Sequence, residues 1–158
     1  MKKDEKEKLL SINVATHLPY AYSAGRYVSR FLVALRDEGK ILASKCATCE
    51  TVLVPPRIVC GQCFAEMRDF VEVGPQGTLT TFSVINFPFI DPFTGVERSV
   101  PYGYAIIQLD GCSNRFPHFL DETDLQKLRI GLRVEAVFKP ANERVGAVTD
   151  ITHFKIIA

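Results

Sequence analysis

The sequence has almost no net charge, and this absence narrows the classes of function. Lysine and arginine together number 19, and aspartate and glutamate 18, which leaves a net charge of +1 across 158 residues. A protein that binds nucleic acid or anionic membranes by neutralising phosphates usually carries a clear excess of basic residues. The balance therefore argues against nucleic acid and against anionic membrane surfaces as the main partners.

The sequence also lacks any segment that is apolar over the length of a membrane span or a secretory signal. Residues 1–8 instead alternate lysine with aspartate and glutamate. We therefore expect a cytoplasmic protein with no membrane association. In that reducing compartment, paired cysteines favour metal binding over disulfides.

Histidine occurs only three times, and tryptophan does not occur at all. His17, His118 and His153 lie far apart, and none has a nucleophile and an orienting carboxylate in a recognisable arrangement. Cys112 lies in the turn-like sequence Asp-Gly-Cys-Ser-Asn, where no neighbour favours a reactive thiolate. We therefore expect that this chain is not an enzyme on its own.

What the sequence does contain is two C-x-x-C pairs separated by ten residues. Cys46 and Cys49 form the first pair, and Cys60 and Cys63 form the second. Each pair places two thiolates on one tight turn, and a short hairpin between the turns brings four sulfurs to the corners of a tetrahedron. This pattern predicts a Zn²⁺ site. A rubredoxin-like iron site would use the same four sulfurs, so iron stays open as a substitute.

The predicted metal site is closed, because all four ligands are cysteine and no histidine or carboxylate lies at ligand spacing. A closed tetrahedral site leaves no position for water or substrate. A redox C-x-x-C motif would need only one pair, beside a helix, and would leave the second pair unexplained. We therefore predict a structural metal, which folds a segment too small to fold alone.

The stretch before the cysteines predicts an extended arm and one helix. Residues 1–22 are interpreted as a tail and an extended apolar arm: the mixed charges of residues 1–11 favour a solvated tail over a short helix, and residues 12–22 show no helical period. Within 23–39, apolar residues recur at three- and four-residue steps, with Ser23 as the N-terminal cap and Gly39 just past the end. The helix and arm either pack on their own domain or dock a partner. Docking would use four aromatic side chains, Tyr20, Tyr22, Tyr27 and Phe31.

Residues 40–67 are predicted to form the four-cysteine zinc ribbon, and residues 68–158 a barrel. The second segment is rich in alternating β-branched and aromatic residues, which predict about five antiparallel strands, with residues 69–73 as the first. A long aromatic loop spans 88–99, and a short helix is expected over 121–129. The expected fold is mainly β: an N-terminal helix and rubredoxin-like zinc ribbon, followed by a five-stranded OB-fold barrel. An SH3-like barrel or a small sandwich is the alternative.

The order of helix, four-cysteine ribbon and barrel, together with several local phrases, resembles a known family. The phrases are FLVALRDEGKILASK at 31–45, VPPR at 54–57, CGQC at 60–63, GTLTTFSV at 77–84, PYGYA at 101–105 and LRIGLRV at 128–134. Members of that family join a rubredoxin-like zinc ribbon to an OB fold. They were first known as a domain of unknown function and are associated with thiolases and acyl-CoA metabolism. The resemblance covers residues 23–157.

This resemblance implies a non-catalytic subunit. Family members resemble partners of thiolase-like enzymes, of hydroxymethylglutaryl-CoA synthases, or of lipid-transfer-type thiolases and aldolases. They are thought to bridge subunits, or to hold the CoA part of a substrate while a cysteine of the partner performs the acyl chemistry. Some belong to degradation pathways for steroids or aromatic compounds. The expected function is therefore that of an accessory subunit in a hetero-oligomer with a thiolase-type acyl-CoA enzyme.

Holding CoA would need positive charge for its phosphates and an apolar groove for its pantetheine arm. The candidates are Arg57, Arg98 and Arg115 for the charge, and Phe87, Phe89 and Phe93 for the groove. Each of them also fits an ordinary solvated arginine or core phenylalanine. A nucleic-acid-binding module is the alternative function, because zinc ribbons and OB folds both occur in such proteins.

Overall fold

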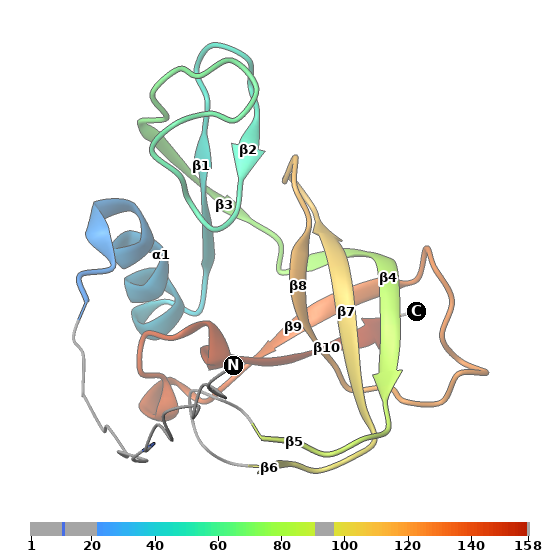
Figure 1. The fold of residues 1–158 in the computed structure, drawn as a ribbon. Helices are drawn as coiled ribbons and strands as arrows, with labels where there is room; N and C mark the ends of the chain where they lie inside the picture. The colour runs from blue at the N-terminus through green and yellow to red at the C-terminus, as the bar shows by residue number, and fades with distance from the viewer. Residues whose placement is uncertain (1–10, 12–21, 91–96, 158) are drawn as a thin grey trace, which may run out of the picture.

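The computed structural model describes residues 11, 22–90 and 97–157, and Figure 1 shows their arrangement in three parts. Helix α1 (Gly25–Asp37) lies beside a three-stranded ribbon sheet in the order β2-β1-β3. The strands of this sheet are β1 (Ile41–Lys45), β2 (Val52–Leu53) and β3 (Asp69–Val73). The third part is a closed barrel. In Figure 1 it lies to the lower right of the ribbon sheet, whereas the cysteine-bearing loops lie at the top.

Five strands close the barrel in the order β10-β8-β7-β4-β9. They are β4 (Gln76–Ile85), β7 (Tyr102–Leu109), β8 (Phe116–Leu120), β9 (Arg133–Phe138) and β10 (Ile151–Ile157). The predicted mainly β fold with an OB-like barrel is thereby confirmed. The expectation that all strands are antiparallel was wrong, because β10 runs parallel to β8. Because β10 also pairs with β9, its two pairings close the barrel.

Gly77 allows β4 to be shared between two neighbours. It pairs with Leu109 on β7 and with Val134 on β9. A Cβ atom at this position would lie 2.6 Å from the carbonyl oxygen of Gln108. The close backbone approach explains why a residue without a side chain occupies the second position of this strand.

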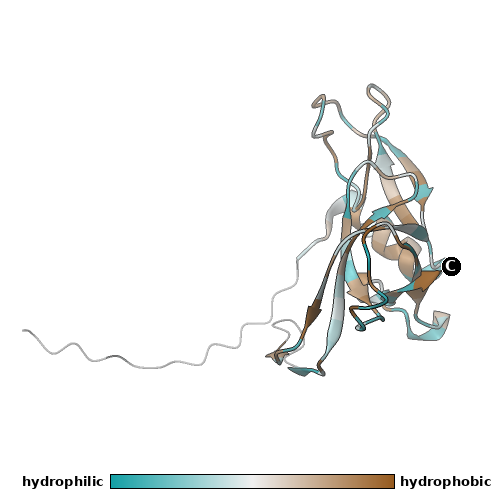
Figure 2. Cartoon of the chain, turned by 90° about the vertical axis from the view of Figure 1, so that its right-hand side faces the viewer, coloured by the Kyte–Doolittle hydropathy of each residue, from teal (hydrophilic) through white to brown (hydrophobic). Residues whose placement is uncertain are grey.

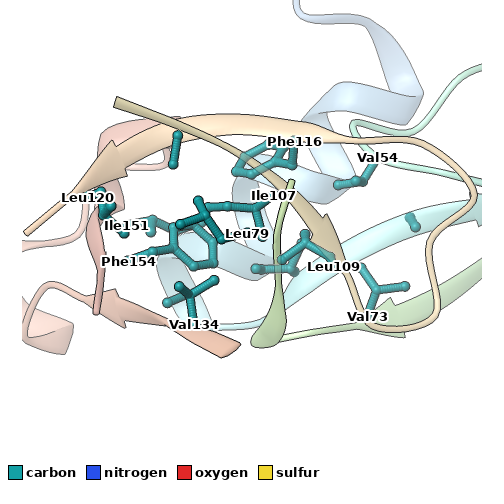
Figure 3. Packing of buried hydrophobic residues seen from close by; sticks show 14 of the residues in the cluster. Val54, Val73, Leu79, Ile107, Leu109, Phe116, Leu120, Val134, Ile151 and Phe154 are labelled. Carbon is teal, nitrogen blue, oxygen red and sulfur yellow. The ribbon is translucent and has the colours of Figure 1, made fainter. Parts of the chain in front are cut away.

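The main core fills the barrel and continues under the helix. Leu79, Ile107, Val134 and Phe154 are fully buried, and Figure 3 shows their side chains pointing toward one another inside the barrel. Phe31 and Leu35 of α1, with Ile41 of β1, belong to the same cluster. Brown and teal residues are mixed along the strands and turns in Figure 2, as expected for elements with one buried face.

Both predicted ends of α1 are found close to their expected positions. The Ser23 hydroxyl accepts a hydrogen bond from the backbone N–H of Gly25 at 3.2 Å, although Ala24 occupies the cap position itself. Gly39 has φ +66°, and the backbone N–H of Lys40 beyond it donates to the Ala34 carbonyl. A left-handed glycine after the last turn lets the chain reverse into β1. In the part of the chain that the model describes, no helix is long and apolar enough to cross a membrane.

Two local expectations within residues 68–158 were wrong. β3, expected as the first barrel strand, pairs with β1 over the whole of Ile41–Lys45 and so belongs to the ribbon sheet. The stretch 121–129 forms turns rather than a helix. In that stretch the Glu122 carboxylate accepts the backbone N–H groups of Thr123 and Asp124, which favours a turn over helical hydrogen bonding.

Short elements complete the fold. In the segment expected to be a long loop, β5 (Phe89–Ile90) pairs with β6 (Glu97–Arg98), as an extension of the β4 and β7 hairpin. Two 3₁₀ turns, η1 (Ala141–Glu143) and η2 (Val148–Asp150), precede β10, and η2 lies against α1. The second turn connects the barrel to the helix.

The ribbon is fixed to the barrel by four hydrogen bonds from the turn between β7 and β8. The Ser113 backbone N–H donates to the Val52 carbonyl at 2.8 Å, and the Val52 N–H donates to the Ser113 hydroxyl at 2.9 Å. The Asn114 side chain accepts from the Val54 N–H at 2.9 Å and donates to the Val54 carbonyl at 2.6 Å. This turn therefore pairs with β2 much as a further strand would, and it sets the angle between ribbon and barrel.

Replacing Asn114 with alanine should loosen that junction. The change leaves both backbone groups of the fully buried Val54 without partners, so we expect a loss of about 2–3 kcal/mol in the free energy of unfolding. Urea unfolding followed by circular dichroism measures it. Asn142→Ala, on the exposed η1 turn, is the matched control and should change stability by less than about 0.5 kcal/mol. Equal stabilities for the two variants would contradict the proposed role of the turn.

Candidate metal centre and docking surfaces

The structure brings the four predicted cysteines together. Their Sγ atoms all lie within 4.8 Å of one another. The Cys46–Cys63, Cys49–Cys60 and Cys49–Cys63 sulfur pairs are each 3.5 Å apart. Four sulfurs at about 2.3 Å from a central ion would be about 3.8 Å apart, so these separations suit a tetrahedral metal site. They are too long for disulfides, and all four thiols are free.

Two similar turns position the sulfurs. The Glu50 N–H donates to the Cys46 carbonyl and the Cys46 N–H to the Thr51 carbonyl. In the second turn the Phe64 N–H donates to the Cys60 carbonyl, and the Cys60 N–H to the Ala65 carbonyl. Glu50 and Phe64, each directly after the second cysteine of its pair, have φ 60° and 59°. The repeated backbone pattern shows that each C-x-x-C pair forms the same knuckle.

Backbone N–H groups favour the thiolate form at two of the cysteines. The pKa of Cys46 is lowered chiefly by the N–H of Cys49, and the pKa of Cys60 chiefly by the N–H of Cys63. The pKa of Cys49 is lowered as well, first by the hydroxyl of Thr51. Metal ligation requires the thiolate, so the knuckles prepare these sulfurs for a cation.

The fourth cysteine shows why a cation fits this group. The Ala65 N–H favours the Cys63 thiolate, but contact with Cys49, burial and the other two sulfurs outweigh it and raise the pKa of Cys63 to about 12. Four adjacent thiolates without a positive charge repel one another. A metal ion held by Cys46, Cys49, Cys60 and Cys63 would supply that charge and crosslink the two knuckles. All four tetrahedral positions would be filled by sulfur, so the role is structural.

Cys112 is separate from this site. It lies half-buried in the turn beside the ribbon, and burial raises the pKa of its thiol to about 11. A thiol with a raised pKa is a poor nucleophile at neutral pH. The expectation of an inert turn cysteine agrees with this environment.

The residues expected to contact CoA separate into two groups. Arg98 lies opposite Phe89 across the β5–β6 pair, and Phe87 is exposed nearby in the chain. Arg57 and Arg115 are both exposed close to the junction of ribbon and barrel, since they lie within three residues of the hydrogen-bonded Val54 and Asn114. Phe93 lies outside the described residues. The roles of this set toward CoA stay a prediction.

The four residues expected to dock a partner also have different positions. Phe31 is fully buried in the main core, so its side chain faces the barrel and is not available to a partner. Tyr22 is exposed, and Tyr20 lies outside the described residues. Tyr27 is half-buried, with its ring 5.2 Å from that of Phe70 on β3. The helix thus uses Phe31 for packing, and only its other faces can meet a second protein.

Among the contacts in which an arginine covers an aromatic ring, sequence reasoning missed two that join distant parts of the chain. Arg98 lies over the Phe119 ring at 3.7 Å from its centroid, and Arg30 lies over Phe70 at 4.7 Å. Such contacts are stabilising when the guanidinium is partly shielded from water. Each pair joins residues at least 20 positions apart in the chain, and no local sequence signal could have found them.

His118 is a core histidine rather than a base. It lies against the rings of Phe116, Phe119 and Phe154. Its Nε2 lies 3.4 Å from the Val148 carbonyl, and its Nδ1 is buried without a hydrogen-bond partner. Burial lowers the pKa of His118 below the ordinary value of 6.5. The ring is therefore neutral at physiological pH.

We expect this histidine to destabilise the fold in mild acid. Because the folded pKa is lowered, the unfolded chain binds the proton first, and stability falls as pH drops below 6.5. In His118→Phe, the fall in the urea midpoint between about pH 7.5 and about pH 5.5 should be smaller than in the parent protein. Loss of metal in acid affects both proteins alike, so their difference reports His118. An identical pH dependence in the two would contradict the prediction.

Comparison with known proteins places the two parts of the chain in one family. The protein-family model described as "ChsH2, rubredoxin-like zinc ribbon domain" matches residues 33–68. A second family model, "ChsH2, C-terminal OB-fold domain", matches residues 70–139. A "DUF35 domain-containing scaffold protein" of Methanothermobacter thermautotrophicus is 31% identical over 104 residues, which are 65% of this chain and 74% of the relative. The chain belongs to the DUF35 family. The resemblance seen in the sequence is thereby confirmed.

Further DUF35 proteins agree. A scaffold protein of the same description from Methanocaldococcus jannaschii is 28% identical over 110 residues, 69% of this chain and 74% of that protein. The solved structure titled "Ltp2-ChsH2(DUF35) aldolase" has a TM-score of 0.61 at 21% identity, over 86% of this chain and 97% of the other. A DUF35 protein of unknown function from Sulfolobus solfataricus has a TM-score of 0.55 at 18% identity, over 80% and 81%. At these identities the structural matches show a shared fold.

Proposed function

We propose that this DUF35 chain is a non-catalytic accessory subunit of a thiolase-type acyl-CoA enzyme. It docks to the enzyme and helps to hold or position the CoA part of the substrate. Two relatives described as scaffold proteins support the accessory role. The fold shared with a chain titled "Ltp2-ChsH2(DUF35) aldolase" supports an enzyme as the partner. An acyl-CoA from the breakdown of an aromatic or steroid compound is the proposed substrate class.

The observation that carries this proposal is the hydrogen-bonded junction between ribbon and barrel. Ser113 and Asn114 hold the backbone of Val52 and Val54 through four bonds, so the ribbon keeps a fixed angle to the barrel. A scaffold needs such rigidity, because it must present two surfaces to a partner at a constant separation. The closed sulfur site supports the same role, since it stiffens the ribbon and offers no position for a substrate.

Within this proposal the metal is Zn²⁺, with iron as a substitute in purified protein. Zinc and iron both accept four thiolates in a tetrahedron, so the sulfur positions alone suit either ion. Elemental analysis of protein from its native cell distinguishes them. About one zinc per chain supports zinc as the native metal. About one iron per chain, with the visible absorption of iron bound to thiolates, contradicts zinc as the native metal.

The CoA contact is proposed at the barrel end that carries the β5–β6 hairpin. There Phe87 and Phe89 are exposed, and Arg98 lies beside Phe89 and covers the Phe119 ring. Apolar surface suits the pantetheine arm, and a guanidinium suits a phosphate. Arg57 and Arg115 would contribute only if the bound molecule reaches the ribbon end.

The test is purification from the native cell with identification of whatever accompanies the chain. A thiolase-type enzyme in a defined stoichiometry supports the proposal. CoA is then titrated onto the chain alone and onto the complex, and acyl-CoA turnover is measured for both. Saturable CoA binding in the complex, with turnover only when the partner is present, is the expected result. Turnover by the chain alone, or no saturable binding in either sample, would overturn it.

A further inference from the structure

A groove of about 420 Å³ lies between α1 and the ribbon sheet, away from the barrel. One wall is the helix, with Arg30, Val33 and Ala34. Its floor is Leu42 of β1 and Phe70 of β3. A second hollow shares Phe70 and continues past the helix start along Arg26, Tyr27, Glu66 and Arg68.

The groove forms because only one face of the ribbon sheet packs in the main core. Ile41 and Ala43 of β1 point into the main core, so the alternate residue Leu42 points to the opposite face. Ser44 pairs with Phe70 and Leu42 with Glu72, which places Phe70 on that same outer face. Arg30, Val33 and Ala34 of α1 lie beside that outer face, whereas Phe31 and Leu35 of the same helix are buried in the main core. Val33 is left 44% exposed at the rim.

The two ends of the groove carry opposite charge. Arg30 lies over Phe70, and the adjoining hollow is lined by Arg26 and by Arg68, which pairs with Glu66 at 2.7 Å. Glu38 lies at the other end, where Lys40 lies 3.7 Å from Glu38 and 3.0 Å from Glu72. The first end is therefore net basic and the second net acidic. Glu38 caps the C-terminus of α1, eight residues after Arg30, so the two ends lie about 12 Å apart along the helix axis.

The distance between the two charged ends sets the length of a segment that could pair with both of them. An extended chain covers about 12 Å in about four residues. The fitting occupant has an acidic side chain for Arg30, a basic side chain for Glu38 about four residues away, and an apolar side chain between them over Leu42 and Phe70.

We infer that this groove binds such a segment of the partner enzyme. The inference rests on the proposed function, to which it adds the place and chemistry of the docking contact. Charge complementarity argues against the chain's own arm as the occupant. Residues 2–8 carry both charges but no apolar residue between an acidic and a basic one, and residues 12–21 contain no lysine, arginine, aspartate or glutamate. A partner segment that carries both charges satisfies both ends at once.

A photo-crosslinking residue at Val33 in the full chain tests the inference within the complex purified with the partner. Leu125, exposed on a barrel turn, carries the same group in the control. The expected product joins position 33 to a partner peptide in which an acidic and a basic residue flank an apolar one. A crosslink to residues 1–21 of this chain or to a second copy would overturn the inference. So would a complex that forms normally and yields no partner crosslink from position 33.

A charge reversal gives a second, independent readout. Arg30→Glu should weaken the complex about tenfold or more, whereas Arg129→Glu, exposed on the barrel, should change the dissociation constant less than about twofold. Metal content and melting temperature are measured on both variants to show that they fold. A basic residue placed at the crosslinked acidic position of the partner should restore binding to Arg30→Glu. If Arg30→Glu binds the partner as well as the parent chain does, the groove is not the docking site, but the accessory-subunit proposal stands. If the parent chain binds no thiolase-type enzyme, the proposed function itself is wrong.

Discussion

Cys60→Ser is expected to abolish stoichiometric metal binding and to unfold the cysteine-bearing end of the ribbon. The buried side chains there form a small cluster of their own, Cys46, Cys60 and Met67, separate from the main core. Three buried residues cannot offset the entropy of ordering two knuckles. Structural zinc supplies on the order of 10 kcal/mol in modules of this kind, so losing one ligand removes most of what holds this end together.

The damage should stop before the barrel. Ile41, Ala43 and Val54 of the ribbon are packed in the main core with the barrel residues, so β1 and the barrel have support that does not depend on metal. Hydrogen exchange read by mass spectrometry should therefore show lost protection over the two knuckles, residues 46–51 and 60–67, and retained protection over β4, β7 and β8. Elemental analysis of the same samples reports the metal.

Cys112→Ser is the matched control, because it also removes a thiol but lies outside the sulfur cluster. It should keep about one metal per chain and the parent exchange pattern. Full metal content and parent-like protection of residues 46–51 and 60–67 in Cys60→Ser would show that the four sulfurs are not the ligands. Loss of protection throughout the barrel would instead show that ribbon and barrel fold as one unit.

Asp150→Ala is expected to lower the free energy of unfolding by about 4 kcal/mol. The Asp150 carboxylate is fully buried and accepts hydrogen bonds from three consecutive backbone N–H groups, those of Val145, Gly146 and Ala147, at 2.7–3.2 Å. Hydrogen bonds to a charged group contribute about 1.5–3 kcal/mol each, although their sum is less than additive. Truncation to alanine leaves all three donors without this acceptor.

This carboxylate matters because of where its loop lies. A Cβ on Gly146 would be 3.6 Å from the carbonyl oxygen of Leu32 in α1, so the loop passes directly against the helix. The turn η2, which ends at Asp150, is one of the elements that pack against the helix, and the ribbon strand β1 is another. Loss of the loop should release α1 and the groove wall that it forms.

Urea unfolding measures the effect, with Asp150→Asn and Glu143→Ala as comparisons. Asparagine keeps one acceptor oxygen, so an intermediate loss is expected. Glu143 is exposed in the same loop, and its truncation should cost less than about 0.5 kcal/mol. Should Asp150→Ala and Glu143→Ala unfold at the same urea concentration, the carboxylate would not be the anchor we describe.

The same residue gives the fold a dependence on acid. Burial opposes the charge of Asp150, but the three N–H groups outweigh it and hold its pKa below the ordinary 3.8. The unfolded chain therefore takes up the proton first, and this stabilisation is present above pH 3.8 and is lost as the pH falls through the lower folded value. In Asp150→Ala that part of the acid dependence should be absent.

The metal site could be predicted from sequence because its information is local. Two C-x-x-C turns each fix a pair of sulfurs within four residues, and only a short hairpin is needed to bring the pairs together. The same holds for α1, whose apolar period and closing Gly39 define it within one segment. Phe31 shows the limit of such reasoning. The period placed it on an apolar face, but only the barrel packed against that face shows that it is a core residue.

Strand membership could not be predicted in the same way. β3 alternates like any half-buried strand, and its sequence does not say whether it pairs with β1 or within the barrel. The anchors Asn114 and Asp150 carried no signal either. One acts on a backbone 60 residues away, and the other on a loop whose path depends on the helix.

The sequence by itself determined the closed four-cysteine site, the helix and the β-rich barrel, because each follows from residue types at short, regular spacing. Only the tertiary structure decided how these parts are joined and which surfaces they leave free. The turn at Ser113–Asn114 sets the angle of the ribbon, and the position of α1 beside its outer face leaves the charged groove. Both depend on contacts between residues far apart in the chain. Such contacts are fixed by packing and register, and no local pattern of residues encodes them.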